Sequence, residues 1–424
     1  MTLRTDCLSL IRFVFLIAVL PFAAQAADWS AATTSGLIVG VLKWQKPGLD
    51  SFSNVHRKDR ELYDVLIRRG VSPENLGILL DAQATRAKIL DEVRNRSRTA
   101  QAGSTFILYY AGHGLQENKT TYLANYDLDI NQAALTGLSV DDFYPILASE
   151  FKGNTLILMG DFCYSGSLKI LAEKLSRSGK RAVFLTSSSA SNESTGNWTF
   201  SQTVIDCFSG YGLCDVNSDG RITLEEMSNE VSKAMVGRER QLFGYGSYGV
   251  PASLIISPVQ NRIEAKGLVG SYVLAPYSNR LQPARVLAES TQDIKAEFYF
   301  YSDKKSVKVA KSQIKKLEFK SLAVGTRTKV SWGGKWYPAK VIQTREPFHL
   351  VTYEGYDSTW DEWVTMDRML DPKGVMIEWK GKWFPGQIKK KENGKYFVSY
   401  EGYGPEWDEW IGPNRLEIGA NQSN

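Results

Sequence analysis

The sequence predicts an α/β domain with a mostly parallel six-stranded sheet flanked by helices, followed by small all-β barrels. Strand-like and helix-like stretches alternate from about residue 34 to residue 258, which is typical of a parallel sheet covered on both faces. After residue 262 the helical periodicity fades, and short alternating strands, glycine turns and tryptophans replace it. A segment of roughly fifty residues then recurs, and such a period with several short strands indicates small barrels in series.

Short apolar runs give the expected strands of the first domain, and glycine or polar residues bound them. The first helix is expected from Asn54 to Arg69, because Gly70 then terminates it. A second helix is expected to open at Ala84–Thr85. The expected strands cover residues 36–42, 76–80, 104–111, 154–160, 181–186 and 252–256.

His113 and Cys163 each follow one of these apolar runs, in the motifs Gly–His–Gly and Asp–Phe–Cys–Tyr–Ser–Gly. The carboxyl ends of parallel strands form the ligand crevice of an open sheet, so both side chains should reach the same edge. A thiol and an imidazole placed in this way are the parts of a cysteine nucleophile and its base. Of the other two histidines, His56 lies in a polar helix start and His349 in a barrel strand, which leaves His113 as the candidate base.

The first 26 residues have the pattern of a cleavable export signal. Arg4 and Arg12 accompany an apolar core at residues 13–20, and Ala24–Gln25–Ala26 offers small residues for cleavage before Ala27. The apolar core is short for a membrane span, and a retained anchor is the alternative. We therefore expect a secreted or periplasmic protein with no membrane span in the mature chain.

Composition and cysteine count narrow the class further. A chain that is 43% hydrophobic and 23% charged is globular rather than disordered. The net charge of +5 is small for 424 residues, so we expect no nucleic-acid partner. Cys7 leaves with the signal, and Cys207 and Cys214 bracket a flexible hexapeptide that a disulfide would close. Cys163 is then the unpaired thiol; three ordinary thiols are the alternative.

The His113 and Cys163 motifs resemble those of the caspase, metacaspase and legumain clan of cysteine peptidases, and the resemblance covers residues 33–258. It implies a caspase-like sandwich in which Cys163 is the nucleophile and His113 the general base and acid. Backbone N–H groups of Gly114 and Cys163 would form the oxyanion hole, worth roughly 3 kcal/mol per donor. Glycine at position 114 would let the backbone approach the substrate closely.

Asp161 stands two residues before the expected nucleophile, on the same face of its strand. The segment from Asp161 to Gly166 is similar to metacaspases and their bacterial relatives and differs from the Gln–Ala–Cys of animal caspases, so aspartate specificity is not implied. In metacaspases the aspartate at this position helps to bind a basic side chain, which implies cleavage after Arg or Lys. The alternative is a carboxylate that only caps the next helix.

Residues 215–226 match the calcium loop of an EF-hand, with oxygen ligands at the first, third, fifth and ninth positions and the final glutamate. Expected helices flank the loop, from Phe200 to Phe208 and from Glu225 to Met235. A turn without a ligand is the alternative. The expected Ca²⁺ ligands are Asp215, Asn217, Asp219, Arg221 through its carbonyl, Thr223 and Glu226.

Three repeat units are expected at residues 266–320, 322–370 and 371–418. The second and third resemble chromo-barrel and Tudor-knot domains, because Tyr–Glu–Gly–Tyr is followed in each by Trp–Asp–Glu–Trp. The first unit lacks the latter motif and is a degenerate version. The resemblance implies an aromatic cage for methylated lysine, held by cation–π attraction; aromatics that only build the core and rim are the alternative. The cage residues are Tyr337, Tyr353, Tyr356 and Trp360 in the second unit, and Phe384, Tyr400, Tyr403 and Trp407 in the third.

The sequence therefore favours an exported cysteine endopeptidase that cleaves peptide or protein substrates after Arg or Lys. Calcium would assist it, and the barrels would localise it on a protein or envelope ligand. The alternative is a catalytically inert adaptor of the same fold whose barrels do the binding.

Overall fold

The computed structural model describes most of the chain after residue 28. Its described residues are 29–55, 57–188, 198–235, 243–263, 266–278, 280–300, 303–316, 320–332, 335–345, 348–356, 360–371 and 374–419. The expected export signal and His56 lie outside them. Within the described part, no helix is long and apolar enough to cross a membrane.

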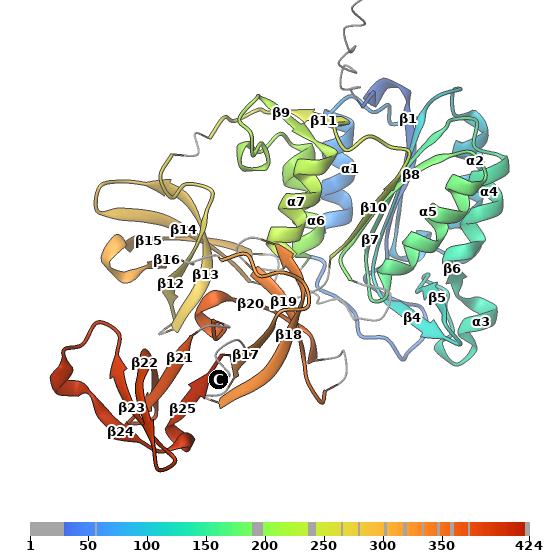
Figure 1. The fold of residues 1–424 in the computed structure, drawn as a ribbon. Coiled ribbons are helices and arrows are strands. Elements are labelled where there is room, and N and C mark those ends of the chain that lie inside the picture. Colours follow the sequence, from blue (N-terminus) through green and yellow to red (C-terminus); the bar gives the residue numbers. More distant parts are fainter. Residues whose placement is uncertain are drawn as a thin grey trace, which may run out of the picture.

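A six-stranded sheet forms the centre of the first domain, in the order β10-β8-β7-β3-β1-β2 (Figure 1). All neighbouring pairs are parallel except β10 with β8 at one edge. The predicted fold class, a mostly parallel sheet flanked by helices, is confirmed. The strands are β1 (Thr34–Gly40), β2 (Leu76–Leu80), β3 (Thr105–Ala111), β7 (Thr155–Asp161), β8 (Arg181–Thr186) and β10 (Gly244–Tyr248).

Helices cover both faces of this sheet, with α1, α6 and α7 on one face and α2, α4 and α5 on the other (Figure 1). Side chains alternate between the two faces along each strand, so Ile38 packs in one core cluster and Leu37 and Val39 in the other. Two buried cores therefore hold the central sheet in place. The helices are α1 (Lys58–Arg68), α2 (Arg86–Thr99), α3 (Ala133–Thr136), α4 (Tyr144–Ser149), α5 (Leu168–Arg177), α6 (Thr199–Phe208) and α7 (Leu224–Ala234).

Two small antiparallel sheets accompany the central one. The first has three strands, β4 (Gly114–Glu117), β5 (Thr120–Leu123) and β6 (Leu138–Ser139), and it begins directly after His113. The second pairs β9 (Arg221–Thr223) with β11 (Ile255–Pro258).

The prediction that residues 252–256 form the sixth central strand is wrong. Ile255–Pro258 form β11, which pairs with β9, and Leu254 and Ile256 pack in the core cluster that contains α1, α6 and α7. The sixth strand is β10, Gly244–Tyr248, where a Cβ on Gly246 would lie 2.4 Å from the Phe184 ring. Glycine at this edge makes room for a ring that the neighbouring strand projects.

The first helix starts later than predicted. Arg57 has an extended backbone, and its guanidinium bonds the carbonyl of Gly40 and the carboxylates of Asp59 and Asp81. The helix therefore begins at Lys58, and Val55, which lies within the expected helix range, is 73% exposed in the loop before it.

Three antiparallel sheets follow, one for each repeat unit. The antiparallel, curled sheets fit small Tudor-like barrels, as predicted. Each carries a β-bulge at the equivalent place, just after Val286, Val341 and Ile388. The strands are β12 (Tyr272–Tyr277), β13 (Arg280–Glu289), β14 (Asp293–Phe300), β15 (Asp303–Ala310) and β16 (Lys315–Lys316); β17 (Arg327–Trp332), β18 (Lys335–Arg345), β19 (Phe348–Tyr353) and β20 (Glu362–Thr365); and β21 (Val375–Trp379), β22 (Lys382–Glu392), β23 (Lys395–Tyr400), β24 (Glu409–Ile411) and β25 (Leu416–Ile418).

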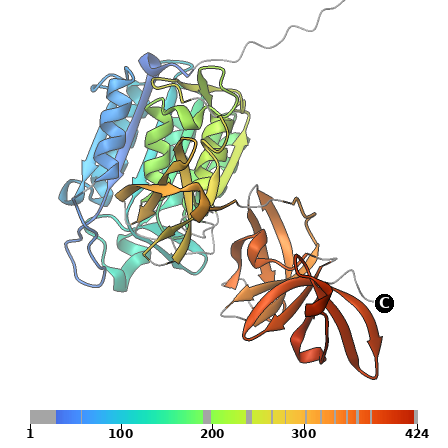
Figure 2. The ribbon, with the colours of Figure 1, turned by 90° about the vertical axis from the view of Figure 1, so that its left-hand side faces the viewer.

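Each unit contacts the next along the chain. The guanidinium of Arg285 in the first barrel pairs with the carboxylate of Glu230 on α7, and both side chains are buried. Between the first and second barrels, Tyr272 contacts Phe348 with ring centroids 6.2 Å apart. Between the second and third, Trp336 and Trp383 meet at 6.2 Å. In Figures 1 and 2 the third barrel lies farthest from the α/β domain.

Candidate active site

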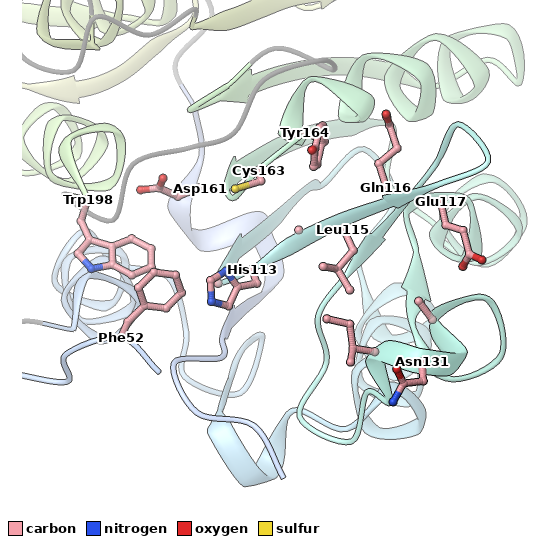
Figure 3. Close-up of a pocket in the computed structure, with 14 residues that line it drawn as sticks. Phe52, His113, Leu115, Gln116, Glu117, Asn131, Asp161, Cys163, Tyr164 and Trp198 are labelled. Atoms are coloured by element: carbon pink, nitrogen blue, oxygen red, sulfur yellow. The ribbon is translucent and has the colours of Figure 1, made fainter. Parts of the chain in front are cut away.

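The strands β3 and β7 deliver His113 and Cys163 to the same edge of the sheet. The two strands are parallel neighbours, and Ala111 pairs in register with Asp161. His113 and Cys163 each stand two residues beyond this pair, so the register alone brings them together. They line one pocket of about 640 Å³ (Figure 3). The other lining residues are Phe52, Gly112, Gly114, Leu115, Gln116, Glu117, Ile130, Asn131, Ala133, Asp161, Tyr164 and Trp198.

The imidazole of His113 is held by a backbone carbonyl and two aromatic rings. Nε2 lies 2.9 Å from the carbonyl oxygen of Asp50. Because a carbonyl only accepts, Nε2 carries the hydrogen, and in the neutral ring Nδ1 has the lone pair. The ring centroids of Phe52 and Trp44 lie 4.5 Å and 4.8 Å from that of His113. The loop before α1 thus fixes both the tautomer and the position of the ring.

Gly114 is required by its contact with the backbone of Cys163. A Cβ at position 114 would lie 2.1 Å from the carbonyl oxygen of Cys163 and 2.7 Å from the Phe162 ring. The sequence interpretation expected a close approach to substrate at this glycine. The structure shows a close approach to the backbone of Cys163 itself, and this holds the two predicted oxyanion donors next to each other.

A buried serine pair holds the turn that carries Cys163. Tyr164, the next residue, has a left-handed backbone with φ of 64°, a conformation that a non-glycine residue keeps only when its surroundings enforce it. Ser188, after β8, bonds the Phe162 carbonyl through Oγ, and its Oγ also accepts the N–H of Ser165. The Ser165 hydroxyl lies 3.0 Å from the Ser188 hydroxyl. This serine pair was not predicted from the sequence.

Asp161 lies in the same pocket with a buried carboxylate, 3% exposed. Its Oδ2 accepts from the hydroxyl of Ser201 at 2.5 Å and from the Ser201 N–H at 3.3 Å. Asp161 therefore bonds the first turn of α6, not the next helix α5 that the alternative named, while it also lines the pocket. Trp198, which precedes α6, lines the pocket with a ring 5.2 Å from Phe52.

Residues 215–226 connect α6 to α7, as an EF-hand loop connects its helices. Asp215 accepts the N–H groups of Asp219 and Gly220, and Glu226 accepts those of Val216, Asn217 and Thr223. Asp219 accepts the N–H of Arg221. The donor set, carboxylate and amide oxygens, is of the type that Ca²⁺ prefers. In the described part of the chain, however, no group of three or more acidic, cysteine or histidine side chains is close enough to hold a metal ion as they stand.

Cys207 and Cys214 lie at the end of α6 and just before this loop. Both are buried free thiols in the structure, and their sulfurs are 2.6 Å apart. Burial raises the pKa of both thiols. Cys163, by contrast, is partly exposed in the pocket.

The predicted cage residues form one cluster in each of the last two barrels. In the second barrel Tyr337, Tyr353, Tyr356 and Trp360 are linked by ring contacts of 5.6 to 6.3 Å. In the third, Phe384, Tyr400, Tyr403 and Trp407 are linked in the same way and line a pocket of about 180 Å³.

Each cluster has a fifth aromatic member that the sequence argument missed. Trp332 contacts Tyr337 and Trp360, and Trp379 contacts Phe384 and Trp407. Both tryptophans end the first strand of their unit, and this matching position in the repeat is the sequence signal that could have identified them.

Two family models match this chain. Residues 50–251 match the caspase domain, and residues 322–371 match the Tudor-knot, described as the RNA binding activity-knot of a chromodomain. The chain carries a caspase domain. A caspase domain followed by a Tudor-knot supports a cysteine-peptidase type of function on peptides or proteins, together with a binding module.

Solved structures similar to this chain include a Geobacter sulfurreducens protein, caspase-1 from Spodoptera frugiperda and the Drosophila initiator caspase Dronc. They are 15%, 13% and 14% identical to it, with TM-scores of 0.36, 0.40 and 0.35. The matches cover 54%, 57% and 54% of this chain and 100%, 98% and 85% of theirs. None of the curated proteins matches the chain.

Proposed function

We propose that the protein is a cysteine endopeptidase that cleaves after Arg or Lys. The observation that carries the proposal is a single pocket containing the Cys163 thiol, the His113 imidazole and the buried carboxylate of Asp161. A partly exposed thiol beside an imidazole whose Nδ1 has the lone pair is the arrangement that nucleophilic catalysis needs.

In the proposed reaction, His113 takes the thiol proton of Cys163 and the thiolate attacks the carbonyl carbon of the scissile bond. The N–H groups of Gly114 and Cys163 stabilise the resulting oxyanion. As the C–N bond breaks, the imidazolium gives its proton to the leaving amine, and a thioester remains. His113 then removes a proton from water, which attacks the thioester, and the returning proton restores the thiol.

The proposed preference for basic residues follows from the negative charge of Asp161 in the pocket. A buried carboxylate favours a cationic partner because it lacks solvent to compensate it. Phe52 and Trp198 border the same end of the pocket and would pack on the aliphatic part of an Arg or Lys side chain (Figure 3).

A set of fluorogenic peptides ending in Arg, Lys, Asp or citrulline tests both claims. We expect Arg and Lys peptides to be cleaved, Cys163→Ala and His113→Ala to abolish cleavage, and Asp161→Asn to remove the preference of Arg over citrulline. Iodoacetamide serves as an independent check, because only Cys163 of the three described cysteines is exposed to it. Cleavage that persists in Cys163→Ala would refute the proposal.

The alternative, an inert adaptor, predicts no hydrolysis of any of these peptides by the wild-type protein. It also predicts that Cys163→Ala changes no property of the chain other than thiol content. The two readings are therefore separated by the same measurements.

We further propose that Ca²⁺ binds at residues 215–226 and assists the activity. In the described part of the chain, the bonds to Asp215 and Glu226 come from N–H groups and the Thr223 hydroxyl, none from Lys or Arg, although both side chains are buried. Bound Ca²⁺ would supply the positive charge that two buried carboxylates lack. Asp219, Asn217 and Thr223 would complete the oxygen set, with the carbonyl of Arg221.

Thermal unfolding with and without Ca²⁺ tests this site independently of catalysis. We expect Ca²⁺, but not Mg²⁺ at equal concentration, to raise the melting temperature of the wild type. Glu226→Gln should remove this increase, whereas Glu225→Gln, an exposed neighbour, should retain it. An unchanged melting temperature in EDTA and in Ca²⁺ would contradict the proposal.

We propose that the protein is exported through its first 26 residues and that the barrels localise it on a protein or envelope ligand. The aromatic clusters support a cationic ligand, such as a methylated lysine, because ring faces attract cations and not phosphates. A trimethyl-lysine peptide and an oligoribonucleotide, titrated against tryptophan fluorescence, distinguish this from the RNA binding named in the Tudor-knot description. Trp407→Ala should remove the response to the peptide.

A further inference from the structure

The carboxylate of Asp161 is the end of a buried chain of hydroxyl groups. Ser201 Oγ lies 2.5 Å from Asp161 Oδ2, and the Tyr109 hydroxyl lies 2.5 Å from Ser201 Oγ. A serine hydroxyl has one hydrogen, and a carboxylate only accepts. Ser201 therefore donates to Asp161, and Tyr109 donates to Ser201.

We infer that Ser201, supported by Tyr109, positions the Asp161 carboxylate for the basic side chain of the substrate and keeps it charged. Ser201 is thereby a positioning residue for specificity, without contact to the reacting atoms. The inference rests on the proposed function, since it assigns the recognition of Arg or Lys to Asp161. Neither Ser201 nor Tyr109 belongs to the motifs that identify the thiol and the imidazole.

Because the groups are buried, these hydrogen bonds decide how favourable the charged form of the Asp161 carboxylate is. Tyr109 and Ser201 are fully buried, and Asp161 is 3% exposed, so water cannot replace a lost donor. Loss of a donor makes the charged form of a buried carboxylate less favourable, and a neutral carboxyl group no longer attracts a guanidinium. Burial and the nearby Asp161 raise the pKa of Tyr109 well above its usual value. Tyr109 therefore stays protonated and remains a donor across the range in which peptidases work.

The place of Ser201 on α6 adds a second bond and a charge effect. Its backbone N–H also donates to Asp161 Oδ2, at 3.3 Å. It lies in the first turn of α6, where the helix dipole favours a negative charge. Trp198, which precedes the same helix, has a left-handed backbone and lines the pocket. The start of α6 thus holds both the carboxylate and one aromatic wall of the site.

Steady-state kinetics on matched peptides ending in Arg or in citrulline test the inference. In Ser201→Ala we expect KM for the Arg peptide to rise about tenfold, with kcat nearly unchanged and the citrulline peptide unaffected. Below neutral pH the increase in KM of Ser201→Ala should become larger, because the Asp161 carboxylate has lost a donor that favours its charged form. Tyr109→Phe should also raise KM for the Arg peptide, and more so below neutral pH, but by a smaller factor than Ser201→Ala. Thr203→Ala removes an α6 hydroxyl whose one bond among the described residues goes to the Thr199 carbonyl, and it should match the wild type.

The outcomes separate this inference from the function on which it rests. If Asp161→Asn leaves the ratio of Arg to citrulline cleavage unchanged, the assignment of Asp161 itself fails. If Asp161→Asn removes the ratio while Ser201→Ala and Tyr109→Phe keep it, Asp161 is the receptor and the positioning role of Ser201 is wrong. Equal losses on both peptides in Ser201→Ala would show a purely structural role and would also overturn the inference. Should Ser201→Ala fail to fold, Tyr109→Phe carries the test alone, because it leaves every bond to Asp161 in place.

Discussion

Gly114 and Cys163 are so close that a methyl group on the first would lie 2.1 Å from the carbonyl oxygen of the second. Their N–H groups are the proposed oxyanion donors, and the contact fixes one relative to the other. The spacing between the His and Cys motifs in the sequence gives no hint of this packing.

Gly114→Ala should therefore impair catalysis more than folding. Alanine must push the Cys163 backbone away and so displace an oxyanion donor, which typically costs about 10²-fold in kcat. Fluorogenic assays and thermal unfolding of the same preparation give both quantities. Gly179→Ala places alanine at a glycine with φ of 88° where its Cβ would meet nothing within 4 Å, and it controls for a general loss of stability without any contact to the site. Wild-type kcat in Gly114→Ala would show that the contact is unimportant for the oxyanion hole.

Arg285→Met should destabilise the chain strongly. The change leaves the carboxylate of Glu230 buried without its cation, at a cost of about 3–5 kcal/mol. The double variant with Glu230→Met should recover most of this loss, because no buried charge remains. Urea unfolding compares both with Arg327→Met, which removes a mostly exposed guanidinium. Equal stability of Arg285→Met and Arg327→Met would contradict the role of this pair.

Acid should weaken the second barrel through His349. The ring is fully buried, its Nε2 accepts the Leu322 N–H at 3.3 Å, and burial lowers its pKa from the usual 6.5. The unfolded chain takes up a proton below about pH 6.5, while the folded barrel resists it. Stability is therefore complete above that pH and is lost as the pH falls toward the lowered folded value. We expect the free energy of unfolding of the wild type to fall between pH 7.5 and pH 5, and this decrease should be absent in His349→Gln. The control variant His113→Gln should show the same decrease as the wild type.

Cys207 and Cys214 should form a disulfide in the exported protein. Their buried sulfurs already lie 2.6 Å apart, at a place where α6 turns toward residue 215. Mass spectrometry without reduction should show a chain lighter by two hydrogen atoms, with Cys163 alone alkylated. Three alkylated thiols in protein recovered from an oxidising compartment would contradict this expectation.

The strand ends could be predicted from the sequence because buried parallel strands are continuous apolar runs, and β3 and β7 are such runs. Their carboxyl ends then place His113 and Cys163 at one edge. The same reasoning failed for Ala252–Ile256, an apolar run whose Leu254 and Ile256 pack in the core cluster of α6 and α7 and of which only the last two residues enter the two-stranded sheet. The true edge strand, Gly–Tyr–Gly–Ser–Tyr, is too poor in aliphatic residues to be recognised, because Phe184 fills the space that its glycines leave.

The supporting residues of the site could not be predicted, because tertiary contacts alone bring them there. Phe52 reaches His113 from an irregular loop, and Ser201 reaches Asp161 from a helix in a later part of the chain. Neither follows a periodic pattern or a motif. Hydrogen bonds between distant segments leave no signature in a single sequence, whereas the residues that carry the chemistry do.

The pairing of β11 with β9, instead of with the central sheet, has a mechanical consequence. The chain leaves β11 directly for the first barrel, and Arg285 of that barrel grips Glu230 on α7. Tension on a tethered barrel would pass first into β9, which lies within residues 215–226, and into α7, which begins at the end of that loop, and only then through α6 to the pocket. The predicted calcium loop therefore lies on the path by which a force on the barrels would reach the pocket that contains Cys163.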